Sequence, residues 1–249
     1  MDVPMARSVL VTGSNRGIGL ELVKQLVAAS NRPQWIFATC RDPDGPRAQV
    51  SPRVQLSSKH PLLILHPALY TSQPASVQAA AARVSERLKG ARLNLLINNA
   101  GMALPSTLKS EKPEDMAEVY KTNVIGPMVV SQVFLPLLRK AAQESPQKGM
   151  SCSKAAIINM SSEAGSIANL FAWEYGQVVN YRCSKAALNM LTRCQSLIFA
   201  KEEILCSAVH PGWLKTDMSN HPLISQGNLV TLKQLIHKQS GAGGSCACM

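Results

Sequence analysis

The sequence predicts a doubly wound α/β fold, in which helices cover both faces of a parallel β-sheet. Short apolar, β-branched segments alternate along the chain with segments whose apolar residues recur at helical spacing. The short segments are apolar on both faces, as strands buried in a parallel sheet are. The first of them ends in a glycine-rich turn that leads into a helix. With 249 residues, 46% of them hydrophobic, the chain is long enough to bury such a core and does not have a disordered composition.

The individual elements follow in order. In the first half of the chain we expect a strand over 6–13, a helix over 18–30, strands over 34–40 and 60–66, a helix over 74–90 and a strand over 92–101. Pro74 in the first turn and Gly90 at the end bound the second helix. In the second half we expect one or two helices over 113–142, a strand over 155–162, a helix over 180–202 and a strand over 204–212.

The turn after the first strand, TGSNRGIG (12–19), carries the first candidate site. Gly13, Gly17 and Gly19 allow a tight turn and a close approach of the backbone to a pyrophosphate. The helix that follows would offer its free amides and the positive end of its dipole. An ordinary glycine-rich turn between a strand and a helix is the alternative interpretation.

A second candidate site lies in NYRCSKAALNM (180–190), where Tyr181 precedes Lys185 by four residues. On a helix this spacing places both side chains on one face. A phenol with an ordinary pKa of about 10 releases its proton slowly near neutral pH, and a nearby ammonium should lower that pKa. The pair therefore suits proton transfer, although the same two residues also occur at the polar end of a core helix.

Six motifs, in order over residues 6–218, together resemble the short-chain dehydrogenase/reductase family. They are TGSNRGIG, NNAG (98–101), the asparagine of KTNVIGP, NMSS (159–162), Y-x-x-x-K at Tyr181 and Lys185, and HPGWLKTDM (210–218). FATCRDP, IINMSS, YRCSKAALN and HPGWLKTDM are most similar to the C-factor and sniffer-like carbonyl reductases. The resemblance implies a Rossmann-type sheet, an NADPH-dependent carbonyl reductase activity and a small carbonyl substrate.

The resemblance also assigns roles to residues. It implies a catalytic tetrad of Asn123, Ser162, Tyr181 and Lys185, with Tyr181 as proton donor, Ser162 on the carbonyl oxygen, and Asn123 supporting a water relay to Lys185. Ser161 is the rival to Ser162, since strand alternation lets only one of them face the site. The cofactor residues implied are Gly13, Asn15, Arg16, Gly17, Ile18, Gly19, Arg41, Asn99, Ala100, Gly101, Tyr181, Lys185, Pro211, Gly212, Trp213 and Thr216.

The end of the second strand indicates which cofactor is bound. An acidic residue there binds the ribose 2′-OH of NAD, whereas an arginine nearby accommodates the 2′-phosphate of NADP. The strand ends ATCRDP, so that Arg41 comes before Asp42. Arg16 adds a positive charge inside the glycine loop, although it could simply be solvated. We therefore expect NADP(H).

Ser162 and Tyr181 lie 19 residues apart, more than is usual in the family, and a long segment separates them. We expect it to form a long loop over the substrate. Four of its residues either line an apolar pocket or anchor the loop: Leu170, Phe171, Trp173 and Tyr175.

The sequence departs from the family pattern in two places. No Asp or Glu lies between residues 45 and 85, and Tyr70 or a neighbour falls where the family carries an adenine-binding aspartate. Residues 1–218 are expected to form one dinucleotide-binding and catalytic domain, whereas 219–249 should form an atypical helix over 228–238 and a flexible tail. The usual last strand would then be missing, which would weaken a homodimer. The terminal CACM fits a prenylation pattern at Cys246.

Composition limits the remaining functions. The net charge of +11 suits anionic partners, but the basic residues are dispersed and no nucleic-acid-binding motif occurs, so that no nucleic acid is expected. The seven cysteines lack metal-ligand spacing, which predicts a reduced, cytoplasmic protein without a metal. No transmembrane segment or cleaved leader is expected. A cofactor-binding, catalytically weak interaction protein is the alternative function.

Overall fold

The computed structural model describes residues 6–45, 63–65, 68–170 and 173–212. Within them six parallel strands form one sheet in the order β3-β2-β1-β4-β5-β6. The strands are β1 (Ser8–Thr12), β2 (Trp35–Thr39), β3 (Leu63–Leu65), β4 (Leu95–Asn98), β5 (Ala156–Met160) and β6 (Leu205–Val209). The predicted doubly wound parallel sheet is confirmed, and the strand order reverses between β1 and β4, where such folds bind their ligands.

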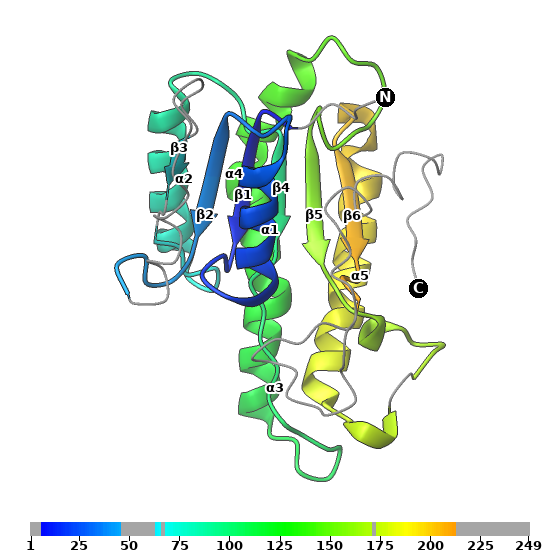
Figure 1. The fold of residues 1–249 in the computed structure, drawn as a ribbon. Coiled ribbons are helices and arrows are strands. Elements are labelled where there is room, and N and C mark those ends of the chain that lie inside the picture. The colour runs from blue at the N-terminus through cyan, green and yellow to red at the C-terminus, as the bar shows by residue number, and fades with distance from the viewer. Residues whose placement is uncertain (1–5, 46–62, 66–67, 171–172, 213–249) are drawn as a thin grey trace.

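Helices cover both faces of this sheet. The α-helices are α1 (Gly17–Ala28), α2 (Pro74–Leu88), α3 (Pro113–Tyr120), α4 (Gly126–Gln143) and α5 (Val179–Phe199). Figure 1 shows α1 in front of the sheet and α2, α4 and α5 behind it. Two separate sets of buried apolar residues follow this arrangement, one containing Leu22 and Leu26 of α1 and the other Phe134 and Leu138 of α4.

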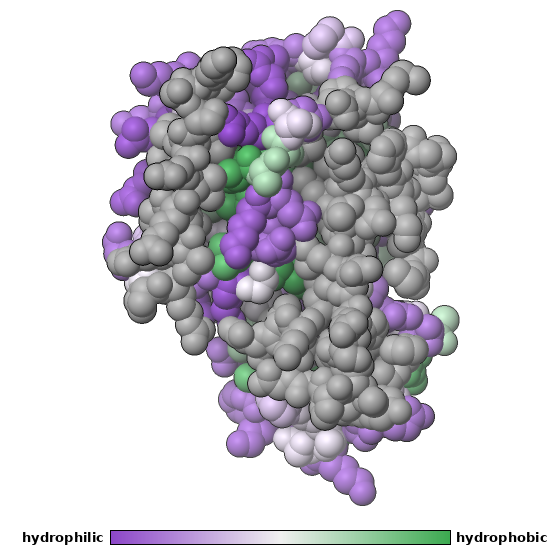
Figure 2. Space-filling model, viewed as in Figure 1, coloured by the Kyte–Doolittle hydropathy of each residue, from purple (hydrophilic) through white to green (hydrophobic). Residues whose placement is uncertain are grey.

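The amphipathic pattern of α1 explains its position. Leu22, Val23, Leu26 and Val27 are buried against the sheet, whereas Lys24 is exposed. Figure 2 shows hydrophilic side chains over much of the outward surface of this helix, with apolar residues beside them. Burial of one helical face, at about 25 cal/mol per Å² of apolar surface, holds α1 on the sheet.

The one or two helices predicted over 113–142 form one continuous helical stretch that contains a π-helical turn. Residues Lys121–Ile125 form a π-helical turn, η1, between α3 and α4. Pro113 lies in the first turn of α3, where its missing amide donor is not needed. Pro127 lies just after η1. This stretch is the one described helix that is long and apolar enough to cross a membrane, but half of its most apolar window is buried inside the molecule, as in a core helix.

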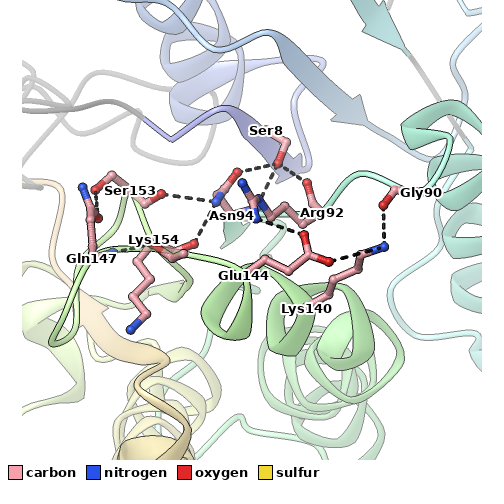
Figure 3. Close-up of polar contacts among 10 residues, drawn as sticks. Ser8, Gly90, Arg92, Asn94, Lys140, Glu144, Gln147, Ser153 and Lys154 are labelled. Carbon is pink, nitrogen blue, oxygen red and sulfur yellow. Dashed lines mark hydrogen bonds and ion pairs between the residues drawn. The ribbon is translucent and has the colours of Figure 1, made fainter.

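A polar network joins the amino ends of the central strands. Ser8 of β1 donates to the Arg92 carbonyl (2.6 Å) and to Asn94 Oδ1 (3.0 Å), and Asn94 Nδ2 donates to the Lys154 carbonyl (2.8 Å). Lys154, 2% exposed, forms an ion pair with Glu203 just before β6. Figure 3 shows how the contacts of Ser8 and Asn94 link segments far apart in the sequence. They lie at the opposite edge of the sheet from the candidate site.

Several predictions fall outside the described residues. These are the expected helix over 228–238, the missing last strand, the flexible tail and the prenylation motif at Cys246. The extent of the single domain to residue 218 likewise stays a prediction.

Candidate active site

The predicted phosphate loop joins β1 to α1 and depends on two of its glycines. Gly13 has a φ of +65°, and a Cβ there would lie 2.9 Å from the Ala100 Cα. A Cβ on Gly19 would lie 2.3 Å from the Gly13 carbonyl oxygen. Both contacts are too close for a side chain, so the turn closes only with glycine at these positions.

The NNAG segment at the end of β4 is joined directly to this loop. Thr12 Oγ1 accepts hydrogen bonds from the Asn99 and Ala100 amides, both at 3.0 Å. Asn99 Nδ2 in turn donates to the carbonyls of Thr12 (2.9 Å) and Gly13 (3.1 Å). The ends of β1 and β4 therefore form one rigid unit at the point where the strand order reverses.

The start of α1 has the properties of an anion site. Arg16 is its N-cap residue, no side chain caps the helix, and no acidic residue lies in its first turn. The first amides of a helix lack partners within the helix. Gly17 has a φ of +52°, Asn15 is half-buried, and Ile18 packs against the core. These residues fit the pyrophosphate of a dinucleotide.

The two predicted arginines lie on exposed positions beside this loop. Ser14 links the loop to β2, because its amide (3.0 Å) and hydroxyl (3.1 Å) both donate to the Thr39 carbonyl. Arg41 follows β2 by two residues, and Arg16, Arg41 and Asp42 are all exposed. The fold therefore puts both arginines near the ends of neighbouring strands.

The structure brings Ser162, Tyr181 and Lys185 together at the carboxyl edge of the sheet. Tyr181 and Lys185 lie one turn apart on α5, and the Lys185 ammonium is 5.4 Å from the centre of the Tyr181 ring. The Tyr181 hydroxyl forms a hydrogen bond with Ser162, which follows β5. Lys185, 4% exposed, donates to the Met160 carbonyl at 2.7 Å.

The pKa of Tyr181 differs from the prediction. Burial raises the pKa of its hydroxyl, and the hydrogen bond with Ser162 opposes part of the rise. Burial also lowers the pKa of Lys185 to about 8. The expected net lowering of the tyrosine pKa was wrong for this structure, because burial disfavours the phenolate more than the neighbouring side chains favour it.

The neighbouring serine has a different environment. Ser161 is buried and donates to Asn189 Oδ1 at 2.6 Å. Its hydroxyl is therefore directed towards α5, whereas Ser162 is half-buried beside Tyr181. Of the two alternatives left open by the sequence, this geometry favours Ser162.

Asn123 lies in the π-helical turn η1 and is fully buried. Its side chain accepts from the Met102 amide (2.9 Å) and donates to the Met102 carbonyl (2.8 Å) and to Ser184 Oγ (2.9 Å). A Cβ on Gly101 would lie 3.3 Å from Asn123 Oδ1 and 3.8 Å from Lys185 Nζ. The asparagine thus anchors the backbone after NNAG beside the lysine.

The remaining predicted residues are only partly described. Pro211 and Gly212 follow β6 at the same edge of the sheet, whereas Trp213 and Thr216 lie outside the described residues. Trp173 packs under Arg182, whose guanidinium carbon is 5.4 Å from the ring centre, and Leu170 is exposed. Phe171 lies outside the described residues, and so does the Tyr175 side chain. Trp173 therefore anchors the loop.

The region after β3 holds Tyr70, which is 39% exposed. Its amide donates to Ser76 Oγ at 2.9 Å. Among the residues that the structure describes, no group of three or more His, Cys, Asp or Glu side chains could hold a metal ion.

Sequence reasoning missed several residues that support the site. Thr12, Asn159 and Ser184 hold its parts together, and Asn159 links Asn98 (2.9 Å) to Thr192 (2.8 Å) and Gln195 (2.9 Å) on α5. The available signal was an asparagine in the otherwise apolar strand IINM, since a buried amide must find partners.

Comparisons with known proteins agree with this geometry. A family model described as short chain dehydrogenase matches residues 7–223. An NADPH-bound carbonyl reductase from chicken fatty liver is 60% identical, with a TM-score of 0.82, over 88% of this chain and 80% of that chain. The carbonyl reductase Sniffer of D. melanogaster is 34% identical, with a TM-score of 0.78, over 86% of this chain and 83% of that chain.

A shorter match joins the chain to C-signal of Myxococcus xanthus, which is 35% identical over 127 residues, 51% of this chain and 68% of the relative. The glycine loop, NNAG, Tyr181 and Lys185 lie on the elements that the six motifs predicted for them. The chain therefore belongs to the short-chain dehydrogenase family of oxidoreductases.

Proposed function

We propose that this protein reduces the carbonyl group of an aldehyde, ketone or quinone to an alcohol with NADPH. The observation that carries this proposal is the convergence of Ser162, Tyr181 and Lys185 at the sheet edge that also holds the phosphate loop. Family membership and the 60% identity to an NADPH-bound carbonyl reductase support it. A small carbonyl compound is therefore the proposed partner. The proposed location is the cytoplasm, on the cysteine pattern of the sequence.

The side chains divide the chemistry between them. Bound NADPH supplies a hydride to the carbonyl carbon. Tyr181 gives its proton to the oxygen, which becomes more basic as it gains charge, and Ser162 donates a hydrogen bond to the same oxygen. The raised pKa of Tyr181 keeps the hydroxyl protonated at neutral pH, which suits an acid in the reductive direction.

Lys185 and Asn123 hold this arrangement in place. Lys185 has a pKa of about 8, so it is mainly protonated near neutral pH and favours the phenolate that forms after proton transfer. Asn123 holds Met102 and Ser184 in place through hydrogen bonds from its side chain.

NADP(H) is the proposed cofactor. The supporting observations are the two exposed arginines, Arg16 and Arg41, near the ends of β1 and β2, and the uncapped start of α1. Both guanidinium groups suit a 2′-phosphate. Binding titrations should give tighter binding of NADPH than of NADH, and Arg41→Ala should weaken NADPH binding but leave NADH binding nearly unchanged. Equal losses for both cofactors would contradict the assignment.

The activity itself is tested by NADPH oxidation with a panel of quinones, aldehydes and ketones. Tyr181→Phe should lower kcat by about 10²-fold or more, because it removes the proton donor but keeps the ring. NADPH affinity should change little. A variant as active as the parent would refute the assigned mechanism.

A cofactor-binding protein with little catalysis is the second candidate. The observation that favours it is the region after β3, where Tyr70 is exposed and the sequence offers no acidic residue between 45 and 85 to contact adenine. Binding of NADPH without turnover on any substrate of the panel would support this candidate against the first.

A further inference from the structure

We propose that Glu111 is a positioning residue for Tyr181, because its carboxylate caps the first turn of α5 through Asn180. This inference rests on the proposed function of Tyr181. Glu111 lies on the segment that leads from NNAG to α3, 70 residues before the tyrosine in the sequence.

The catalytic helix has no cap of its own. Its N-cap residue is Val178, which has no side-chain acceptor and has a φ of +36° and ψ of +54°. No acidic residue lies in the first turn of α5. The first amides of a helix need acceptors, and a carboxylate is the strongest of them because it also meets the positive end of the helix dipole.

Glu111 supplies that carboxylate from another part of the chain. Its Oε2 accepts from the Asn180 amide at 3.1 Å, and both of its oxygens accept from Asn180 Nδ2, at 3.1 and 3.0 Å. Asn180 is 1% exposed, and its Nδ2 also donates to Ser106 Oγ at 3.0 Å. Hydrogen bonds from Ser106 and Asn180 hold the pKa of Glu111 below its usual value, so the cap is charged at neutral pH.

A second set of contacts secures the same junction. Gln177 Oε1 accepts from the Leu108 amide at 3.0 Å, and Arg182 Nε donates to the Gln177 carbonyl at 2.8 Å. Residues 106–111 therefore hold both the loop before α5 and the helix itself. Tyr181 directly follows Asn180, so a change in the first turn moves its hydroxyl relative to Ser162.

The test compares Glu111→Gln with Glu111→Asp and with Glu118→Gln, an equal change of charge at an exposed position on α3. In Glu111→Gln we expect kcat to fall about tenfold, with little change in the Kd for NADPH, because the acid is displaced but the phosphate loop is not. Glu111→Asp should recover part of the loss, since it keeps the charge. A kcat equal to the parent's in Glu111→Gln, or a matching fall in NADPH affinity, would overturn the positioning role.

Two readouts do not depend on turnover. Hydrogen exchange over residues 179–185 should become about tenfold faster in Glu111→Gln and stay unchanged in Glu118→Gln. The pKa of Tyr181, followed by NMR with labelled tyrosine and assigned by Tyr181→Phe, should rise in Glu111→Gln because the hydrogen bond with Ser162 is weakened. Unchanged exchange and pKa would refute the inference. A parent without carbonyl reduction, but with both changes, would refute only the proposed function.

Discussion

Two adjacent serines lie in different environments, one beside the proposed proton donor and the other inside the molecule. Ser162 contacts the Tyr181 hydroxyl, whereas Ser161 bonds to Asn189 inside the molecule. The sequence alone could not decide which of the two serines faces the site. Strand alternation shows that only one of them does, but it does not show which. That answer depends on how β5 lies against α5, which is a tertiary property.

The two serines should respond differently to removal of the hydroxyl. Ser162→Ala should lower kcat about 10²-fold, because the charged substrate oxygen loses a donor. Ser161→Ala should leave kcat nearly unchanged but cost about 1 kcal/mol in the free energy of unfolding, because a buried hydrogen bond is lost. Steady-state kinetics and urea unfolding distinguish the two, and the reverse pattern would reassign the serine.

Lys185 should make stability depend on pH in the alkaline range. Its pKa is lowered from 10.5 to about 8 in the folded protein. Between these values the unfolded chain binds more protons, so the free energy of unfolding rises with pH, by about 3 kcal/mol in all. Below pH 8 both states are protonated and the contribution is constant.

Urea unfolding of Lys185→Met beside the parent isolates this effect. The parent should gain stability relative to the variant as the pH rises from 8 to 10.5. A constant difference between the two proteins over that range would show that the lysine is not charged and buried as described.

At the scale of elements, the short helix η2 (Glu163–Gly165) sets how β5 meets α5. A Cβ on Gly165 would lie 2.6 Å from the Lys185 carbonyl carbon and 2.8 Å from the Ala186 nitrogen. Both are backbone atoms in the middle of a helix, so they cannot move aside. Gly165 is therefore the contact that lets Ser162 approach α5, the helix that carries Tyr181.

Gly165→Ala should push η2 away from α5, lowering both the melting temperature and kcat. Gly176→Ala is a matched control, because its Cβ would have no neighbour within 4 Å. Differential scanning fluorimetry and NADPH oxidation measure both effects. Equal melting temperatures and equal kcat values in the two variants would show that the close contact at Gly165 affects neither stability nor catalysis.

Most elements could be predicted from the sequence because their signals are local. The strand at Trp35–Thr39 and the helix at Pro74–Leu88 lie within a few residues of the predicted ranges. The π-helical turn at Lys121–Ile125 could not be predicted, because it depends on the contacts of Asn123 with Met102 and Ser184. Glu111 was missed for the same reason, since nothing near it in the sequence shows that it meets Asn180.

At the scale of the whole molecule, different groups of residues lie at the two edges of the sheet. The carboxyl edge carries the candidate site, and the amino edge carries the network of Ser8, Asn94 and Lys154 (Figure 3). Lys154 is buried, and the hydrogen bond from its ammonium holds the pKa of Glu203 below its usual value. This pair joins the start of β5 to the start of β6.

Glu203→Gln should therefore lower the melting temperature at neutral pH while leaving kcat unchanged. A carboxylate with a lowered pKa contributes stability above its ordinary value of 4.5, and that contribution is lost as the pH falls through the folded pKa. The difference between parent and variant should shrink in acid. Glu202→Gln, which breaks the exposed pair with Arg139, is the control and should have the smaller effect.

The left-handed backbone at Val178 has a consequence for attempts to improve this protein. A β-branched residue in that conformation carries strain of about 1–3 kcal/mol. Asparagine tolerates the same conformation, so a selection for heat resistance should readily recover Val178→Asn. Since the strained residue directly precedes the helix that carries the proposed proton donor, such a substitution would also change the backbone freedom just before Tyr181. A substitution at Val178 would therefore change both heat resistance and turnover.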